Sequence, residues 1–199
     1  SSDLVATIRA LRHHGGAPKE EYNTASVERV SSGFSNLGKH IENCKKFGLK
    51  EYYESVIDNP YLEDFYGDMS RWSFNLQIYF LHHRFSGHIE MSENPFGVIQ
   101  DRTIYEDVEI FARNLYDMKF MSKRDWETYC DLFKNMTRFL TKPDLIIYLQ
   151  ANTDVLINRI QNRNRDFEQK IDVEYIHRLN LTYDKWIKGI TDIPVLIIN

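Results

Sequence analysis

The stretch that decides the fold is FGVIQDRTIYED, residues 96–107. Its first half is a short apolar run, which predicts a buried strand over Phe96–Gln100. Asp101 and Arg102 follow at once, so an acid and a base stand where that strand would end. Ligands of open parallel sheets gather beyond the carboxyl ends of the strands, which makes both side chains candidates for a binding or catalytic site. The other interpretation of such a pair is a cap with a surface ion pair.

Strand and helix patterns alternate on both sides of this stretch. Short apolar runs predict further strands at Leu4–Ile8, Tyr52–Val56, Leu145–Leu149 and Pro194–Ile198. Helical spacing of apolar residues predicts helices over residues 26–47, 70–85, 105–118, 122–139, 154–162 and 173–188. Strands that alternate with helices predict an α/β fold, with a parallel sheet covered on both faces.

Composition and charge exclude several classes of protein. The chain has 199 residues, of which 42% are hydrophobic and 14% aromatic, enough for one domain with a sizeable core. A net charge of −4 argues against general nucleic-acid binding. Cys44 and Cys130 lack the spacing of metal ligands, which fits a reducing compartment. The apolar runs are too short to cross a bilayer, and residues 1–50 show no signal-peptide pattern, so we expect a soluble cytoplasmic protein without a membrane partner.

The predicted helix over residues 70–85 carries two polar residues on one face. Gln77 and Arg84 are seven residues apart, which places them two helical turns from each other. A glutamine amide offers a donor and an acceptor together, which suits the edge of a nucleobase. Asp107 is placed to pair with Arg84 and orient it. The alternative for Gln77 is an ordinary solvated glutamine of a helix.

Three arginines follow the predicted strand Leu145–Leu149. Arg159 and Arg163 share a helix face at i,i+4, and Arg165 comes just after them. Three guanidinium groups in this arrangement are able to close over phosphates. The alternative is a basic helix end, placed near its own C-terminal dipole.

From Tyr52 to Asn199 the chain resembles the bacterial deoxyadenosine and deoxyguanosine kinases, a group of deoxynucleoside kinases. The motifs in the family's order and spacing are Tyr52-Tyr53-Glu54-Ser55-Val56, Asn59-Pro60-Tyr61-Leu62, Arg71-Trp72-Ser73-Phe74, Gln77, Arg84, Asp101 to Asp107 and the arginine-rich segment. The resemblance implies a parallel sheet of the P-loop nucleoside kinase type. It also implies ATP-dependent phosphorylation of the 5′-hydroxyl of a deoxynucleoside, with a purine favoured, and a homodimer.

The resemblance also implies a role for each matching residue. Glu54 would be the general base that takes the proton from the 5′-hydroxyl, and Tyr66 and Glu168 would hold the sugar 3′-hydroxyl. The residues that would read the base are Gln77, Arg84 and Asp107. Those that would act on the phosphates are Asp101 through Mg²⁺, Arg102 on the transferring phosphoryl group, and Arg159, Arg163 and Arg165 in a lid over ATP.

Residues 1–50 resemble an unrelated protein, an internal stretch of formate–tetrahydrofolate ligase. The stretches that carry this resemblance are Val5 to Leu11, His14-Gly15-Gly16, Asn36 to Asn43 and Lys46-Phe47-Gly48. We therefore divide the chain into a ligase-like segment, 1–50, and a kinase-like domain, 51–199, joined near Lys45 to Lys50. The order strand, loop and helix in the first segment leads to the hypothesis that it replaces the first strand and helix of the kinase fold.

The chain contains no GxxxxGK[ST] motif. Parallel α/β kinases hold nucleotide phosphates with the backbone N–H groups of that loop and with its lysine. We therefore expect a phosphate-binding loop to be missing and turnover to be depressed by orders of magnitude. Two other functions stay open at this point: a nucleoside-binding module without catalysis, and a remnant of the folate ligase.

Overall fold

The structure is a computed structural model that describes residues 8–12, 49–52, 59–95, 97–163 and 171–198. The predicted helix over 26–47 lies outside these residues, as does most of the predicted strand Tyr52–Val56. Three predicted site residues also lie outside them: Glu54, Arg165 and Glu168.

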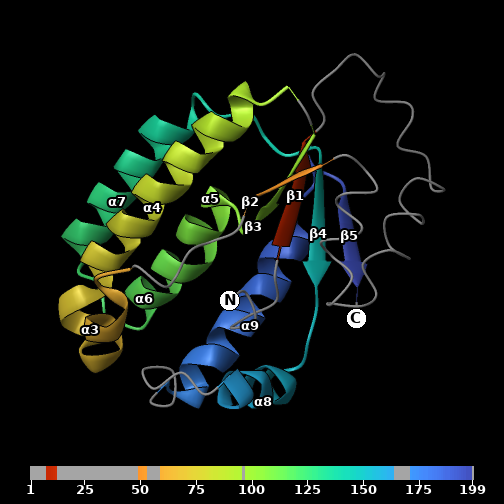
Figure 1. The fold of residues 1–199 in the computed structure, drawn as a ribbon. Coiled ribbons are helices and arrows are strands. Elements are labelled where there is room, and N and C mark those ends of the chain that lie inside the picture. The colour runs from red at the N-terminus through yellow and green to blue at the C-terminus, as the bar shows by residue number, and fades with distance from the viewer. Residues whose placement is uncertain (1–7, 13–48, 53–58, 96, 164–170, 199) are drawn as a thin grey trace.

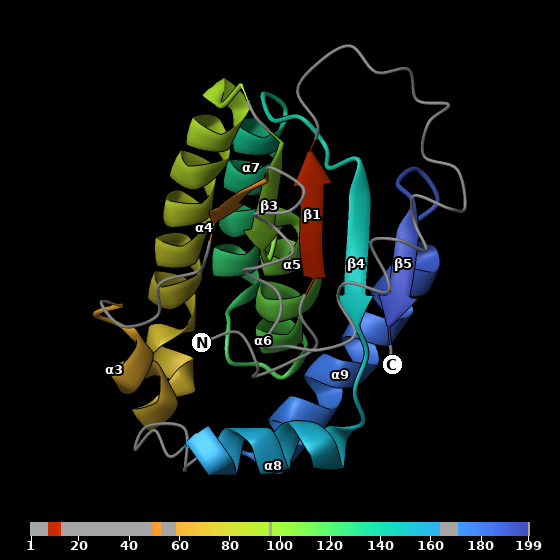
Figure 2. The ribbon, with the colours of Figure 1, turned by 45° about the vertical axis from the view of Figure 1, so that its right-hand side comes forward.

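The described residues form one sheet of five strands, in the order β2-β3-β1-β4-β5. The strands are β1 (Ile8–Arg12), β2 (Lys50–Tyr52), β3 (Val98–Asp101), β4 (Leu145–Leu149) and β5 (Val195–Ile198). β2 runs parallel to β3, and β4 runs parallel to β5. β1 lies in the centre and runs antiparallel to β3 and β4, with Ala10 opposite both Gln100 and Ile146. Figure 2 shows the arrow of β1 pointing against that of β4.

The central strand differs from the sequence prediction in direction. We expected a strand at Leu4–Ile8 that runs with its neighbours. Residues 4–7 of that prediction lie outside the described residues, and β1, at Ile8–Arg12, runs against its neighbours. A strand in this place pairs the edges of β3 and β4, whose backbone groups would otherwise lack partners. Antiparallel pairing satisfies them as fully as parallel pairing does. The backbone groups of β3 and β4 are therefore paired by a central strand, although the sequence did not predict that this strand is antiparallel.

Helices connect the strands and supply most of the core. They are α3 (Leu62–Gly67), α4 (Met69–Glu93), α5 (Ile104–Glu106), the π-helix η3 (Asp107–Ala112), α6 (Arg113–Asp117), α7 (Lys123–Thr137), α8 (Thr153–Arg163) and α9 (Val173–Gly189). The helix expected over 70–85 extends to Glu93, and its start is fixed by Asp68, whose side chain accepts a hydrogen bond from the Arg71 N–H. The helix expected over 105–118 is divided by η3, and α3 was not predicted.

The strand β4 divides the core into two clusters. Ile146 and Tyr148 pack with α4, α6, α7 and α9, whereas Leu145 and Ile147 pack with Ile99 in a separate cluster. This alternation follows from the two-residue period of a strand. Figure 1 shows α4, α6 and α7 together on one side of the sheet. None of the described helices has the length and apolarity needed to span a bilayer.

The central place of β1 predicts strong protection of its backbone amides. The N–H groups of Ala10 and Leu11 should exchange with solvent about two orders of magnitude more slowly than those of the edge strand β5, because β1 has paired neighbours on both sides. Native-state hydrogen exchange measures this difference directly. Fast exchange throughout Ile8–Arg12, with β4 still protected, would contradict the pairing.

Candidate functional site

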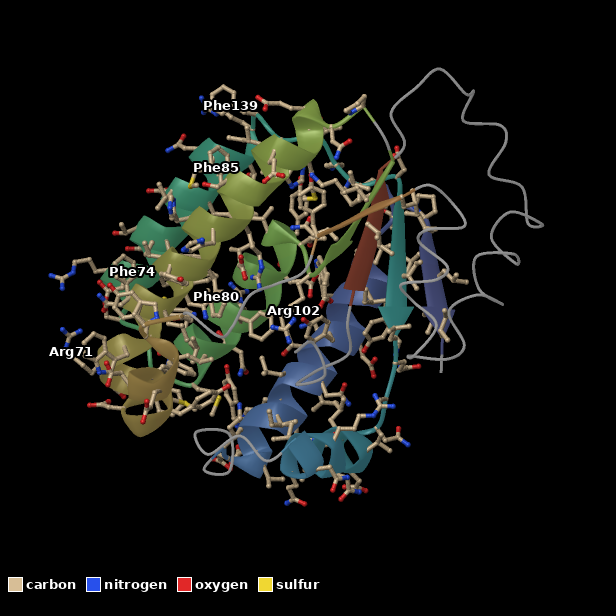
Figure 3. The ribbon with its side chains drawn as sticks, viewed as in Figure 1. Arg71, Phe74, Phe80, Phe85, Arg102 and Phe139 are labelled. Atoms are coloured by element: carbon tan, nitrogen blue, oxygen red, sulfur yellow. The ribbon has the colours of Figure 1, made fainter. Side chains whose placement is uncertain are left out.

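A cavity of about 590 Å³, counting the open space at its mouth, lies between α3, α4, η3 and α9, next to the carboxyl end of β3. Its polar lining residues are Tyr66, Gln77, Arg84, Arg102 and Asp107. The rest of the lining is apolar or aromatic and includes Phe65, Phe80, Phe111, Tyr175 and Leu179. Figure 3 shows Arg102 and Phe80 in the interior of the molecule, and Arg71 and Phe139 at its periphery. A mostly apolar cavity of this size with a few polar groups is typical of small-molecule sites.

The helix α4 supplies one wall of the cavity. Gln77, Phe80 and Arg84 are spaced at i, i+3 and i+7, so that all three point from the same face. Gln77 is 2% exposed and Arg84 7% exposed, which excludes the interpretation of Gln77 as a solvated helix residue. The guanidinium of Arg84 also lies 5.1 Å from the centre of the Phe80 ring. The buried amide of Gln77 is therefore held beside a charged group and an aromatic ring.

Arg84 forms a buried ion pair with Asp107, the first residue of η3. The carboxylate is 1% exposed. Removing one member of a buried pair leaves an uncompensated charge, at a typical cost of about 3–5 kcal/mol. A π-helical turn contains an extra residue and is often found at functional sites. The predicted pairing of Asp107 with Arg84 is thus present, and it connects the two walls of the cavity.

Arg102 reaches the cavity from a strained backbone. Its φ angle is 63°, in the left-handed region that costs a residue with a side chain about 1 kcal/mol. The residue is buried, and its guanidinium lies 5.0 Å from the centre of the Phe111 ring. Such a conformation persists only where the surrounding structure enforces it. The turn after β3 is therefore built to direct this one side chain.

Glu106 is a fully buried carboxyl group directly beside this turn. Its Oε1 accepts a hydrogen bond of 2.6 Å from the Thr103 N–H, and its carboxyl group accepts one of 2.7 Å from the Tyr183 hydroxyl. With Thr103 it forms a capping box at the start of α5. Burial raises the pKa of Glu106 from 4.5 to about 7, and the guanidinium of Arg102 opposes this rise.

The structure brings five of the predicted site residues into one cavity: Tyr66, Gln77, Arg84, Arg102 and Asp107. Asp101 is buried at the end of β3 but does not line the cavity. Arg159 is exposed on α8 and is not among the lining residues, and Arg163 is the last residue of α8. Whether these arginines meet a ligand stays a prediction.

Sequence reasoning missed several residues of the site. Phe111 and Tyr175 line the cavity. Glu106 does not line it, but it accepts a hydrogen bond from the Thr103 N–H in the turn that carries Arg102. The spacing Thr-x-x-Glu at 103–106 was a signal for the capping box. The aromatic residues gave no comparable signal, because an aromatic residue at helical spacing is as well explained by an ordinary core.

No group of three or more side chains suited to a metal occurs among the residues that the structure describes. Mg²⁺ is commonly held by one or two carboxylates together with substrate phosphates. Asp101, buried at the end of β3, has the hard oxygen ligands that such an ion prefers.

The strand order, the helical cover and the cavity beyond β3 define a nucleoside kinase of the P-loop type. The chain belongs to the deoxynucleoside kinase family, whose family model matches residues 26–199. This range begins within residues 1–50, so the family's pattern reaches into the segment that we compared with a ligase. The ligase resemblance itself stays a prediction.

Relatives and solved structures agree with this family. The chain is 41% identical over 186 residues to the deoxyadenosine/deoxycytidine kinase of Bacillus subtilis, covering 92% of this chain and 83% of the relative. It is 42% identical over 172 residues to the deoxyadenosine kinase of Dictyostelium discoideum, covering 84% and 70%. The structure of M. mycoides deoxyadenosine kinase with dCMP and dCDP bound is similar, with a TM-score of 0.72 and 31% identity over 88% of this chain and 85% of that one. The dATP complex of that enzyme gives a TM-score of 0.70 and 35% identity over 80% and 82%.

The matched range contains most of a phosphate-binding loop motif. Residues 33–40 read Gly-Phe-Ser-Asn-Leu-Gly-Lys-His, which keeps Gly33, Gly38 and Lys39 at the spacing of GxxxxGK[ST]. His40 stands where the motif has serine or threonine. This segment lies outside the described residues, so its relevance is an inference from sequence. The chain therefore keeps the two glycines and the lysine of the motif and lacks only its serine or threonine.

The raised pKa of Glu106 predicts a pH dependence of stability. The folded protein holds this proton more tightly than the unfolded chain does, so the stabilisation is complete below about pH 4.5 and is lost as the pH rises through about 7. Relative to Glu106→Gln, the wild type should therefore lose free energy of unfolding between pH 5 and pH 8, by about 3 kcal/mol at most. Urea unfolding at both pH values measures the difference. Glu127→Gln on the surface of α7 is the control, and parallel pH profiles for wild type and Glu106→Gln would refute the assignment.

Proposed function

We propose that this protein phosphorylates the 5′-hydroxyl of a purine deoxynucleoside, deoxyadenosine in particular, with ATP as the donor. The observation that carries the proposal is the cavity in which Gln77 lies beside the buried Arg84–Asp107 pair. Membership of the deoxynucleoside kinase family, and the deoxyadenosine kinases among the relatives, support the same substrate class.

Recognition of the base follows from the chemistry of the cavity. A glutamine amide matches adenine well, because adenine offers one acceptor and one amino donor side by side. The aromatic rings of Phe80, on α4, and Phe111, on η3, both line the cavity and suit the flat faces of a base. The ion pair fixes the orientation of Arg84, so that its remaining N–H groups have a set direction. Tyr66 lines the cavity near this set, and with Glu168 it is proposed to hold the sugar 3′-hydroxyl.

The phosphoryl transfer requires groups on both sides of the reacting phosphorus. The 5′-oxygen forms a bond to the γ-phosphorus, the bond from that phosphorus to ADP breaks, and the hydroxyl proton goes to Glu54 as the general base. Arg102 is proposed to neutralise the charge on the transferring phosphoryl group, since it lines the cavity directly after the strand end. Arg159, Arg163 and Arg165 are proposed to cover the phosphates of ATP.

Asp101 is the carboxylate proposed to hold Mg²⁺ with the phosphates. When bound, this ion would neutralise phosphate charge. His40 bears on the same step, because the hydroxyl of a serine or threonine at this position of the motif binds the ion. A neutral imidazole prefers softer metals than Mg²⁺. We therefore infer that turnover is reduced by the histidine rather than by loss of the whole loop.

Deoxyadenosine should bind to the purified protein, and the amide of Gln77 should account for much of the affinity. Gln77→Leu should weaken binding by about 10- to 100-fold, because a buried polar contact to the base is lost. Isothermal titration calorimetry measures this effect, and an assay for dAMP formation measures transfer. Asn135→Leu, which removes an exposed amide from α7, is the control. No binding of any deoxynucleoside by the wild type would refute the proposal, whereas binding without phosphorylation would indicate the non-catalytic module.

Restoring the missing hydroxyl should raise the rate. We expect His40→Thr to increase kcat by about 10-fold or more while the KM for the nucleoside changes little, because the new ligand acts on the Mg²⁺–phosphate complex. Steady-state kinetics at saturating Mg²⁺ tests this, with His40→Ala as the matched control that removes the imidazole without adding a hydroxyl. Equal rates in all three proteins would show that position 40 is not part of a phosphate site.

A further inference from the structure

We propose that Glu106 and Tyr183 are positioning residues that hold the turn Asp101–Arg102–Thr103 in the one conformation that directs Arg102 into the cavity. The inference rests on the proposed function of Arg102 and extends it to two residues with no assigned role. As far as the described residues define the cavity, neither Glu106 nor Tyr183 lines it. They therefore act through Arg102 and not on a ligand directly.

The first support is the contact between Glu106 and the strained turn. The carboxyl group of Glu106 is 0% exposed, and it accepts the Thr103 N–H at 2.6 Å. Thr103 follows Arg102, whose φ angle of 63° is unfavourable for a residue with a side chain. A hydrogen bond to the next amide restricts the rotation that would release this strain. Glu106 thus fixes the backbone immediately after Arg102.

The second support is the connection from Glu106 to α9. Tyr183 is completely buried, and its hydroxyl donates to the carboxyl group of Glu106 at 2.7 Å. A tyrosine hydroxyl is a directional donor, and a buried carboxyl oxygen without a partner would cost free energy. The bond therefore anchors the turn after β3 to a helix that is distant in sequence.

The third support is the aromatic contact of Tyr183 with Phe111, the ring that also contacts the guanidinium of Arg102. The ring of Tyr183 meets Phe111 edge to face, at 6.2 Å between centroids, and the guanidinium of Arg102 lies 5.0 Å from the same Phe111 ring. On its other side, Tyr183 stacks on Tyr148 of β4 at 6.2 Å. Arg102 is thus held at its backbone through Glu106 and at its guanidinium through Phe111, and Tyr183 contacts both supports.

In its ionised form, the carboxylate of Glu106 supplies a further constraint. The guanidinium groups of Arg102 and Arg84 both lie close enough to oppose the rise of its pKa. A buried carboxylate attracts both guanidinium groups toward itself, which limits their movement where they line the cavity. Simple packing needs a side chain of this size here, but it does not need a charge.

The test compares ligands that differ by one phosphate. Binding of deoxyadenosine and of dAMP is measured by calorimetry for wild type, Glu106→Gln and Tyr183→Phe. If Arg102 contacts the phosphate, both variants should bind dAMP about 10-fold more weakly and deoxyadenosine within about 2-fold of wild type, because a charge-assisted contact is loosened and the base site is kept. Arg102→Ala should show the same selective loss, and adding Glu106→Gln to it should have no further effect.

Tyr148→Phe is the matched control. It also removes a buried tyrosine hydroxyl that donates to a carboxylate, in this case to Asp184 at 2.9 Å, and it keeps the ring that stacks on Tyr183. It should lower the melting temperature about as much as Tyr183→Phe without changing the ratio of the two affinities. Equal losses for both ligands, or an unchanged ratio in Glu106→Gln and Tyr183→Phe, would overturn the inference alone. A wild type that binds neither ligand would overturn the proposed function and this inference together.

Discussion

The buried ion pair between Arg84 and Asp107 is the constraint on which the site depends. It joins α4 to η3, two elements that line the cavity, and its members are 7% and 1% exposed. Each of the two buried charges stabilises the other, because a single charge buried without its partner would destabilise the folded protein. The pair therefore fixes the distance between the walls as well as the direction of Arg84. Gln77, Phe80 and Phe111 acquire their places relative to one another from this contact.

A second constraint acts at the end of β3. The strained backbone of Arg102, the hydrogen bond from Thr103 to Glu106 and the bond from Tyr183 to Glu106 form one connected group of buried contacts. The two constraints meet, because Glu106 and Asp107 are consecutive residues at the junction of α5 and η3. One carboxylate binds the guanidinium of α4, and the other holds the turn that follows the strand. A single junction in the helix thus organises both the part of the cavity that α4 lines, with Gln77 and Arg84, and the part that Arg102 lines at the end of β3.

Much of the fold was accessible from the sequence, for identifiable reasons. The strand Leu145–Leu149 was predicted with its observed bounds, because a buried strand is a continuous apolar run between turn signals. The helix α9 begins at its predicted residue after Asp172, whose side chain accepts from the Glu174 N–H. The direction of β1 and the π-helical turn η3 were not accessible. Both depend on contacts between segments that are distant in the chain, and neither produces a periodic pattern of apolar residues in the local sequence.

The sequence by itself determined the chemical content of the site. It identified Gln77, Arg84, Asp107 and Arg102 as candidates, since helical periodicity and the position after a strand are local properties. It also determined the family, through motifs with fixed order and spacing. Only the tertiary structure decided that these four side chains, with Tyr66, share one cavity, that Asp101 is buried without lining it, and that Glu106 is buried and bonded to Thr103 and Tyr183. The physical reason is that burial and the pairing of charges arise between elements far apart in the chain, where local spacing carries no information.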